Sequence, residues 1–183
     1  MSSSPSGLYP ALLGASWGTL ARSVQLLHGS SVRAEGTFSV RRGAGRGARI
    51  LARLLGMPGA TERVAISLQV QRSADGERWI RTFGSHPLST SQWRRGSLLV
   101  EAMGLTQCWF RLVAAEGALV FEQVKASFGL RRFWLPLPRL LAPQIAGRAE
   151  PRAGTVHVSV QIGVPLFGLL VAYEGHVTVE VDA

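Results

Sequence analysis

The sequence has only one cysteine and one lysine among its 183 residues. A lone cysteine, Cys108, excludes an internal disulfide and a cysteine-rich metal site. Nineteen of the twenty basic residues are arginine, and Lys125 is the one lysine. This preference for arginine is typical of a GC-rich genome, so the net charge of +9 is weak evidence for nucleic-acid binding. The arginines are scattered from Arg22 to Arg152 and are not clustered with aromatic residues that would stack on bases. We therefore expect no nucleic-acid partner.

Targeting segments and long apolar runs are also missing. The opening MSSSPSG has neither a basic nor an apolar region, which predicts a disordered stretch over 1–7 and no signal peptide. The longest uncharged apolar run, IGVPLFGLLVAY, is too short to cross a bilayer and contains Pro165. A cytoplasmic location is the resulting expectation.

What the chain does have is a globular composition, with 46% apolar and 17% charged residues. This length suits one domain, which we place at 8–183. Two segments have helical periodicity: 8–28, ended by Gly29, and 46–56, ended by Gly56 and Pro58. The apolar stripe of the first segment is Leu13, Trp17, Leu20, Val24 and Leu27.

Most of the remaining chain alternates apolar and polar residues with period two, which predicts strands. The eight predicted strands are 31–42, 63–72, 77–83, 96–103, 107–115, 118–128, 154–164 and 169–181. The connections are too short for parallel crossovers, so the strands should be antiparallel. The expected fold is mainly β with N-terminal helices (α+β), as a bent sheet or a closed β-barrel with a short helix between its first two strands. A barrel of this size can hold one small ligand.

Four charged residues stand on strands between large apolar neighbours on the same face: Arg81, Glu101, Arg111 and Glu122. If they face inward, burial requires them to pair, and the pairs could hold the polar end of a ligand. If this face is the outer one, they are ordinary surface charges, because strands 96–103 and 107–115 are apolar on both faces. Tyr173 shares a face with three valines and should point inward, either as a packed core residue or into a site.

Cofactor and metal motifs are weak. GAGRGA, at 43–48, resembles the start of a dinucleotide fingerprint, but it follows a polar-alternating strand and no βαβ unit surrounds it. The four histidines have no metal-ligand spacing, and no nucleophile has an evident base. We expect neither a metal nor a cofactor.

The stretch LRRFWLPLPRLLAPQ, at 130–144, is too rich in proline to be one helix and predicts a stiff connection. Phe133 and Trp134 could cap one end of the core, or form part of a lid over an apolar cavity. The third interpretation is a membrane contact, in which aromatic and leucine residues lie beside Arg131, Arg132 and Arg139.

An ordered set of short motifs resembles a known family over residues 8 to 180. In chain order the motifs are LYPALLGASW, LLHG, GTFSVRRG, LARLLGMP, ERWIRTF, LLVEAMG, WLPLPRLLAP and VPLFGLLVAYEGHV. They are similar to a bacterial domain-of-unknown-function family whose members occur alone or fused to NAD(P)-binding oxidoreductase or epimerase-like domains. The resemblance implies an accessory module and carries over no catalytic residue. The positions that match the family pattern are Trp79, Arg81, Phe83, Glu101, Pro138, Pro143, Tyr173 and Gly175.

Together these observations predict a module that binds a bulky, mostly apolar small molecule and serves an oxidoreductase partner. The predicted ligand-binding residues are Trp79, Arg81, Phe83, Glu101, Trp109, Arg111, Glu122, Phe133, Trp134 and Tyr173. One alternative is a cofactor-independent cyclase or isomerase of a hydrophobic substrate, with Arg81, Glu101 or Tyr173 as the catalytic group. Another is a peripheral membrane protein, to which the arginines of 46–53 would contribute.

Overall fold

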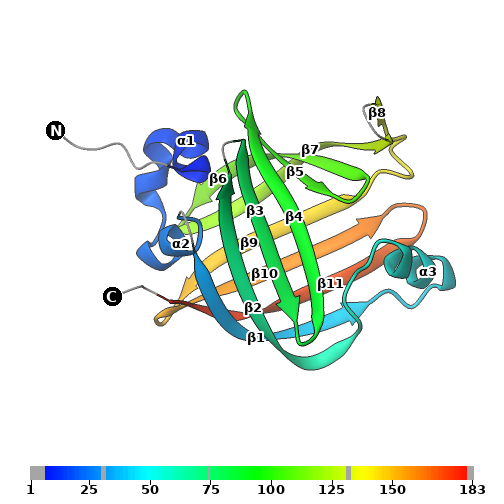
Figure 1. The fold of residues 1–183 in the computed structure, drawn as a ribbon, viewed down its shortest axis with the longest axis horizontal. Helices are drawn as coiled ribbons and strands as arrows, with labels where there is room; N and C mark the ends of the chain where they lie inside the picture. Colours follow the sequence, from blue (N-terminus) through cyan, green and yellow to red (C-terminus); the bar gives the residue numbers. More distant parts are fainter. Residues whose placement is uncertain (1–6, 30–31, 74, 131–132, 181–183) are drawn as a thin grey trace.

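Ten antiparallel strands close into a barrel in the computed structural model, which describes residues 7–29, 32–73, 75–130 and 133–180, with the backbone alone at 130, 133 and 134 (Figure 1). An eleventh strand, β8, pairs with β7 outside the closed ring. The strand bounds are β1 Arg33–Arg42, β2 Thr61–Ser73, β3 Gly76–Phe83, β4 His86–Arg95, β5 Leu98–Met103, β6 Thr106–Ala115, β7 Ala118–Leu130, β8 Phe133–Pro136, β9 Gln144–Arg152, β10 Thr155–Val164 and β11 Gly168–Glu180.

The order of strands around the barrel is β6-β5-β4-β3-β2-β1-β11-β10-β9-β7, and pairing of β7 with β6 closes the ring. Besides β6, the long strand β7 pairs with two other strands. It pairs with β9 over residues 119–122 and with β8 over residues 127–130. The closed ring leaves no free edge among its members, which is how barrels avoid edge-to-edge aggregation.

Short helices cover the two ends of the barrel (Figure 1). The helices α1 (Leu8–Leu13), η1 (Gly14–Thr19) and α2 (Arg22–Leu27) lie at one end, which we call the α1 end. Helix α3 (Arg46–Leu54) lies at the opposite end, the α3 end, together with the loop 137–143. None of the helices in the described residues has the length and apolarity that a bilayer span requires.

The inner face of the barrel follows directly from strand alternation. On β2, Ile66, Leu68 and Val70 are buried, while the residues between them are more exposed. On β1, Ala34, Phe38 and Val40 are likewise buried. Side chains alternate across a strand, so these positions share the face that points into the barrel. The period-two alternation that predicted strands at 31–42 and 63–72 is therefore seen in the burial of their side chains.

The expected fold class is confirmed, and three of its details change. β4, β8 and β9 were not predicted, so the eight expected strands become eleven in the described residues. The helix expected over 8–28 is broken at Gly14, which has a positive φ of 55°, and at Leu20, which is extended. The stretch 130–144, expected to be a stiff connection, contains the last residue of β7, the strand β8 and the first residue of β9. The disorder expected over 1–7 concerns residues 1–6, which lie outside the described residues.

Candidate functional site

A cavity of about 260 Å³ lies inside the barrel and is lined mostly by apolar side chains. One part of its wall carries small residues. β9 contributes Gly147 and Ala149, and β10 contributes Val158 and Val160. Other strands line the same space with the aromatic side chains of Phe38 and Phe121. Small side chains cannot fill the centre of a ten-stranded barrel, which leaves the cavity.

Aromatic rings close the cavity at the α1 end. Tyr9 of α1 lies edge-on to His28, with ring centroids 4.8 Å apart, and also contacts Trp79 and Phe121. The Tyr9 hydroxyl donates a hydrogen bond of 2.7 Å to Gln92 Oε1 on β4. Burial raises the pKa of Tyr9 well above its usual value, so the hydroxyl stays protonated and the seal is uncharged.

His28 belongs to this seal and is buried as a neutral ring. Its Nδ1 donates to the backbone oxygen of Val24 at 3.0 Å. Burial, helped by the positive charge of Arg81, lowers the pKa of His28 from 6.5 to about 4. At neutral pH this end of the cavity therefore contains no charged imidazole.

Arg81 and Glu101, two of the four charged strand residues singled out in the sequence, lie in the wall of the cavity. Arg81 stands on β3 and Glu101 on β5, and the intervening strand β4 places Thr90 between them. The guanidinium donates to Thr90 Oγ1 at 3.0 Å and approaches Glu101 Oε1 to 3.7 Å. Both side chains are largely buried, with 17% and 19% exposed. The pair presents no net charge to the cavity, and several N–H groups of Arg81 remain available to a ligand.

Electrostatics keep Arg81 charged despite its burial. Burial by itself opposes the charge, but the oxygens of Tyr173, Glu101 and Tyr9 outweigh it and raise the pKa of Arg81. The guanidinium also lies over the ring of Trp79, 5.2 Å from its centroid, where the π electrons favour a cation. Cys108 lines the cavity too, and its burial raises the pKa of the thiol to about 12, so it is not a ready nucleophile.

Tyr173 on β11 is the most informative lining residue. Its ring packs against Phe83, with centroids 5.2 Å apart, and against Phe38 at 6.0 Å. Its hydroxyl has no hydrogen-bond partner among the described residues, although the residue is only 6% exposed. Burial raises the pKa of Tyr173, and nearby Arg81 partly opposes that shift. Since Tyr173 lines the cavity, its unpaired hydroxyl can form a hydrogen bond with a bound molecule.

The opposite side of the cavity, at the α3 end, is apolar. Leu51 of α3 and Leu55, which follows the helix, line it with Met57, and the loop 137–143 adds Leu137 and Leu141. Leu141 is 44% exposed, whereas Tyr9 and His28 at the α1 end are buried, so the cavity is closed by aromatic rings at the α1 end and has its mouth at the α3 end.

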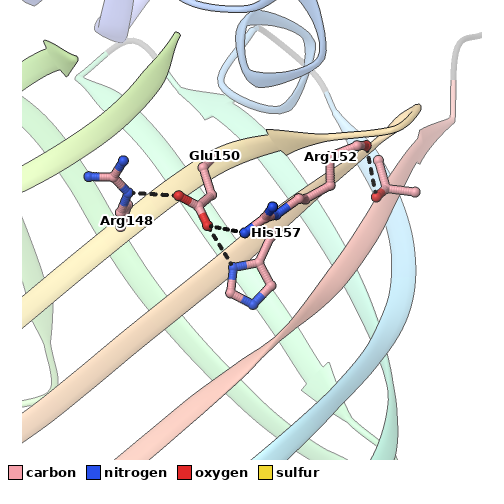
Figure 2. A network of polar contacts seen from close by, with 5 residues as sticks. Arg148, Glu150, Arg152 and His157 are labelled. Atoms are coloured by element: carbon pink, nitrogen blue, oxygen red, sulfur yellow. Dashed lines mark hydrogen bonds and ion pairs between the residues drawn. The ribbon is translucent and has the colours of Figure 1, made fainter. Parts of the chain in front are cut away.

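A second polar cluster, formed by Arg148, Glu150, Arg152 and His157, lies on β9 and β10 (Figure 2). Glu150 on β9 contacts Arg148 at 2.9 Å, Arg152 at 3.2 Å and His157 Nδ1 at 3.5 Å. The hydrogen bond from Arg148 and the other positive charges lower the pKa of Glu150. These pairs are partly solvated, and such pairs contribute little to stability.

The predicted site residues divide between the inside and outside of the barrel. Trp79, Arg81, Glu101 and Tyr173 line the cavity, whereas Phe83 is buried behind Tyr173. The side chains of Phe133 and Trp134 lie outside the part of the chain that the structure describes.

Three residues predicted to bind the ligand, Trp109, Arg111 and Glu122, do not line the cavity. They lie on the outer face of the barrel, which is the second of the two orientations that the sequence left open. Arg111 and Glu122 form a cross-strand pair at 3.9 Å with 66% and 53% of their side chains exposed. Trp109 packs under Lys125, whose Nζ lies 4.5 Å from the ring centroid. The inward positions of β6 belong instead to Cys108 and Phe110, which line the cavity. Both faces of this strand carry apolar side chains and are buried over residues 107–110, so alternation alone does not show which face is inside.

Other residues that line the cavity were not predicted, namely Tyr9, His28, Thr90, Gln92 and Cys108. Thr90 and Gln92 could have been found from the length of the segment between the predicted strands 77–83 and 96–103. Residues 84–95 are long enough to form a further strand, which the structure shows as β4. Among the described residues, no three His, Cys, Asp or Glu side chains form a group that could hold a metal ion.

Comparisons with known proteins give a family and a distant structural likeness. A family model described as "Domain of unknown function (DUF4166)" matches residues 20–177. No curated protein matches the chain. A crystal structure of a protein of unknown function from the DUF3598 family of Nostoc punctiforme is similar at 10% identity, with a TM-score of 0.47. That likeness covers 81% of this chain and 46% of the Nostoc chain, so this chain spans about half the length of that protein.

Proposed function

We propose that this chain, which belongs to the DUF4166 family of domains of unknown function, binds one bulky, mostly apolar small molecule inside its barrel. The observation that supports the proposal is the cavity of about 260 Å³, in which an apolar wall surrounds a small group of converging polar side chains. Ligand sites in proteins have this composition, since apolar area gives affinity and a few polar groups fix orientation.

The polar group on the wall indicates what one end of the molecule should be. Arg81 and Glu101 already balance each other's charge, and the Tyr173 hydroxyl has no partner in the described residues. A charged ligand would leave one charge uncompensated in a buried site, which is costly. An uncharged hydroxyl, carbonyl or ester group can instead bond with Tyr173 and the free N–H groups of Arg81. We therefore propose an apolar molecule with a neutral polar end.

Titration with a hydrophobic fluorescent probe tests this proposal. The probe should bind at one site per chain with enhanced emission, and a lipid extract of the host should displace it. Neutral long-chain alcohols or esters should compete better than the corresponding carboxylates. An absence of both probe binding and displacement would contradict the proposal.

The second candidate function is an isomerase or cyclase that uses the same cavity. The observation that favours it is the convergence of Arg81, Glu101 and Tyr173, since a carboxylate and a phenol beside a cation can move protons. Glu101→Gln should then retain folding and probe affinity and abolish conversion of a bound extract component, measured by chromatography with mass detection. Loss of folding in this variant would instead indicate that Glu101 is a structural partner of Arg81.

An oxidoreductase partner also belongs to the proposal, because the resemblance described above implies one. A dehydrogenase gene beside this one would favour a carrier that hands over its ligand. A biosynthetic gene cluster would favour the enzyme.

A further inference from the structure

Exposed apolar side chains gather at the α3 end of the barrel. Ile50, Leu54, Leu140 and Leu166 are each between 60% and 79% exposed, and Phe167 is 38% exposed. We call these five residues the apolar rim. Three separate segments bring them together: α3, the loop 137–143 and the turn between β10 and β11.

Contacts between the segments hold the apolar rim in place. The backbone N–H of Leu166 donates to the Leu140 oxygen at 3.1 Å. The ring of Phe167 lies against α3 at Gly47, so closely that a Cβ at that glycine would stand 2.8 Å from the ring. The rim is therefore one continuous surface and not a set of unrelated leucines.

Helix α3 has two apolar faces, and only one of them is needed for the core. Ala48 and Ala52 are buried, and Leu51 and Leu55 line the cavity. Ile50 and Leu54 point the other way, into solvent. Packing within the barrel therefore does not explain why Ile50 and Leu54 are apolar. A contiguous exposed apolar surface usually marks an interaction site.

Charge around the apolar rim has one sign. Arg46, Arg49 and Arg53 of α3 and Arg139 of the loop are exposed. The segments 43–59, 135–143 and 164–168 contain no aspartate or glutamate. None of the four arginines forms an ion pair with any described residue. A surface with aliphatic tips and unpaired arginines is complementary to an anionic lipid interface.

We propose that the α3 end of the barrel docks on an anionic lipid bilayer, with the apolar rim among the acyl chains and the four arginines at the headgroups. The mouth of the cavity lies at this same end, where two partly exposed residues line it: Leu55, which follows α3, and Leu141 of the loop. An apolar molecule can then pass from the bilayer to the cavity without crossing water. Docking itself does not depend on the proposed ligand, because the rim and its charges lie on the surface.

Vesicle flotation of the full chain tests the docking surface. At low ionic strength the protein should float with vesicles of phosphatidylcholine and phosphatidylglycerol, and stay in solution with phosphatidylcholine alone. Ile50→Ser combined with Leu54→Ser should weaken binding by at least about tenfold, since both apolar tips are lost. Arg46→Gln combined with Arg49→Gln should also weaken it by at least about tenfold, and raised salt should do the same to the wild type.

The matched control removes two exposed arginines from the other end of the barrel. Arg94→Gln combined with Arg95→Gln changes the end of β4, close to Gln92 and α1, and should leave flotation unchanged. Thermal melting checks that each variant is folded, as expected for surface positions.

Three results would overturn the proposal. One is no flotation with the anionic vesicles at low salt, and another is equal loss in the control variant. The third is a dimer in sedimentation velocity that Ile50→Ser with Leu54→Ser dissolves, in the absence of flotation, which would assign the rim to a second copy of the chain. Probe binding measured on the same samples reports on the cavity separately, so failure of docking and failure of ligand binding are distinguishable.

Discussion

The Val158→Trp substitution is expected to weaken binding of the hydrophobic probe by nearly a hundredfold while the barrel stays folded. Val158 points into the cavity from β10, beside the small residues Gly147 and Ala149 of β9. An indole at this position would occupy the space left by the small side chains. Excluding about 100 Å² of ligand surface removes roughly 2.5 kcal/mol of binding free energy. Fluorescence titration gives the affinity, and thermal melting verifies the fold.

The neighbouring position provides the control. Ser159 is the next residue on β10 and faces outward, so Ser159→Trp adds the same ring to the outer surface. Its probe affinity should match that of the wild type. Equal affinities in all three proteins would mean that the probe binds elsewhere, and the cavity would lose its assigned role.

Acidification should destabilise the protein by about 3 kcal/mol between pH 7 and pH 4 through His28 alone. The pKa of His28 is 6.5 in the unfolded chain and about 4 in the buried site. Below pH 6.5 the unfolded chain binds a proton that the folded chain does not, so stability is complete above that pH and declines as the pH falls. Urea unfolding at a series of pH values measures the slope.

The His28→Phe variant isolates this effect from the carboxylates. It keeps an aromatic ring in the seal formed with Tyr9, loses the hydrogen bond to Val24, and has no group that titrates in this range. It should start about 1 kcal/mol less stable at pH 7 and lose less stability on acidification than the wild type. Identical losses in the two proteins would show that His28 is not the neutral buried ring described above.

Alternation of large apolar side chains was sufficient to predict most of the barrel. β2, with Ile66, Leu68 and Val70 inward, is readable from period two alone. The same parity argument singled out Arg81 and Glu101 and required charges on an inward face to pair, and these two residues line the cavity as an ion pair. It could not orient Arg111 and Glu122, because the strands around them are apolar on both faces and local sequence does not say which face is inside.

The elements that sequence analysis missed are the ones that shape the cavity. β4 directs Thr90 and Gln92 inward, and β9 directs Gly147 and Ala149 inward. Polar and small side chains break the apolar alternation that identifies a strand, and for the same reason they leave space and hydrogen-bonding groups inside the barrel. Tyr9 and His28 were missed for another reason: the docking of a helix on a barrel end depends on contacts distant in sequence.

Native mass spectrometry of the gently purified protein tests the central claim, that the barrel holds an apolar molecule, most directly. The wild-type protein should be heavier than the bare chain by the mass of one small molecule, which mild denaturation releases. The Val158→Trp variant should have the mass of the bare chain. The released molecule should partition into organic solvent and carry an uncharged polar group. Binding of an apolar molecule would be contradicted if the wild-type protein had the mass of the bare chain and also took up no component of a lipid extract.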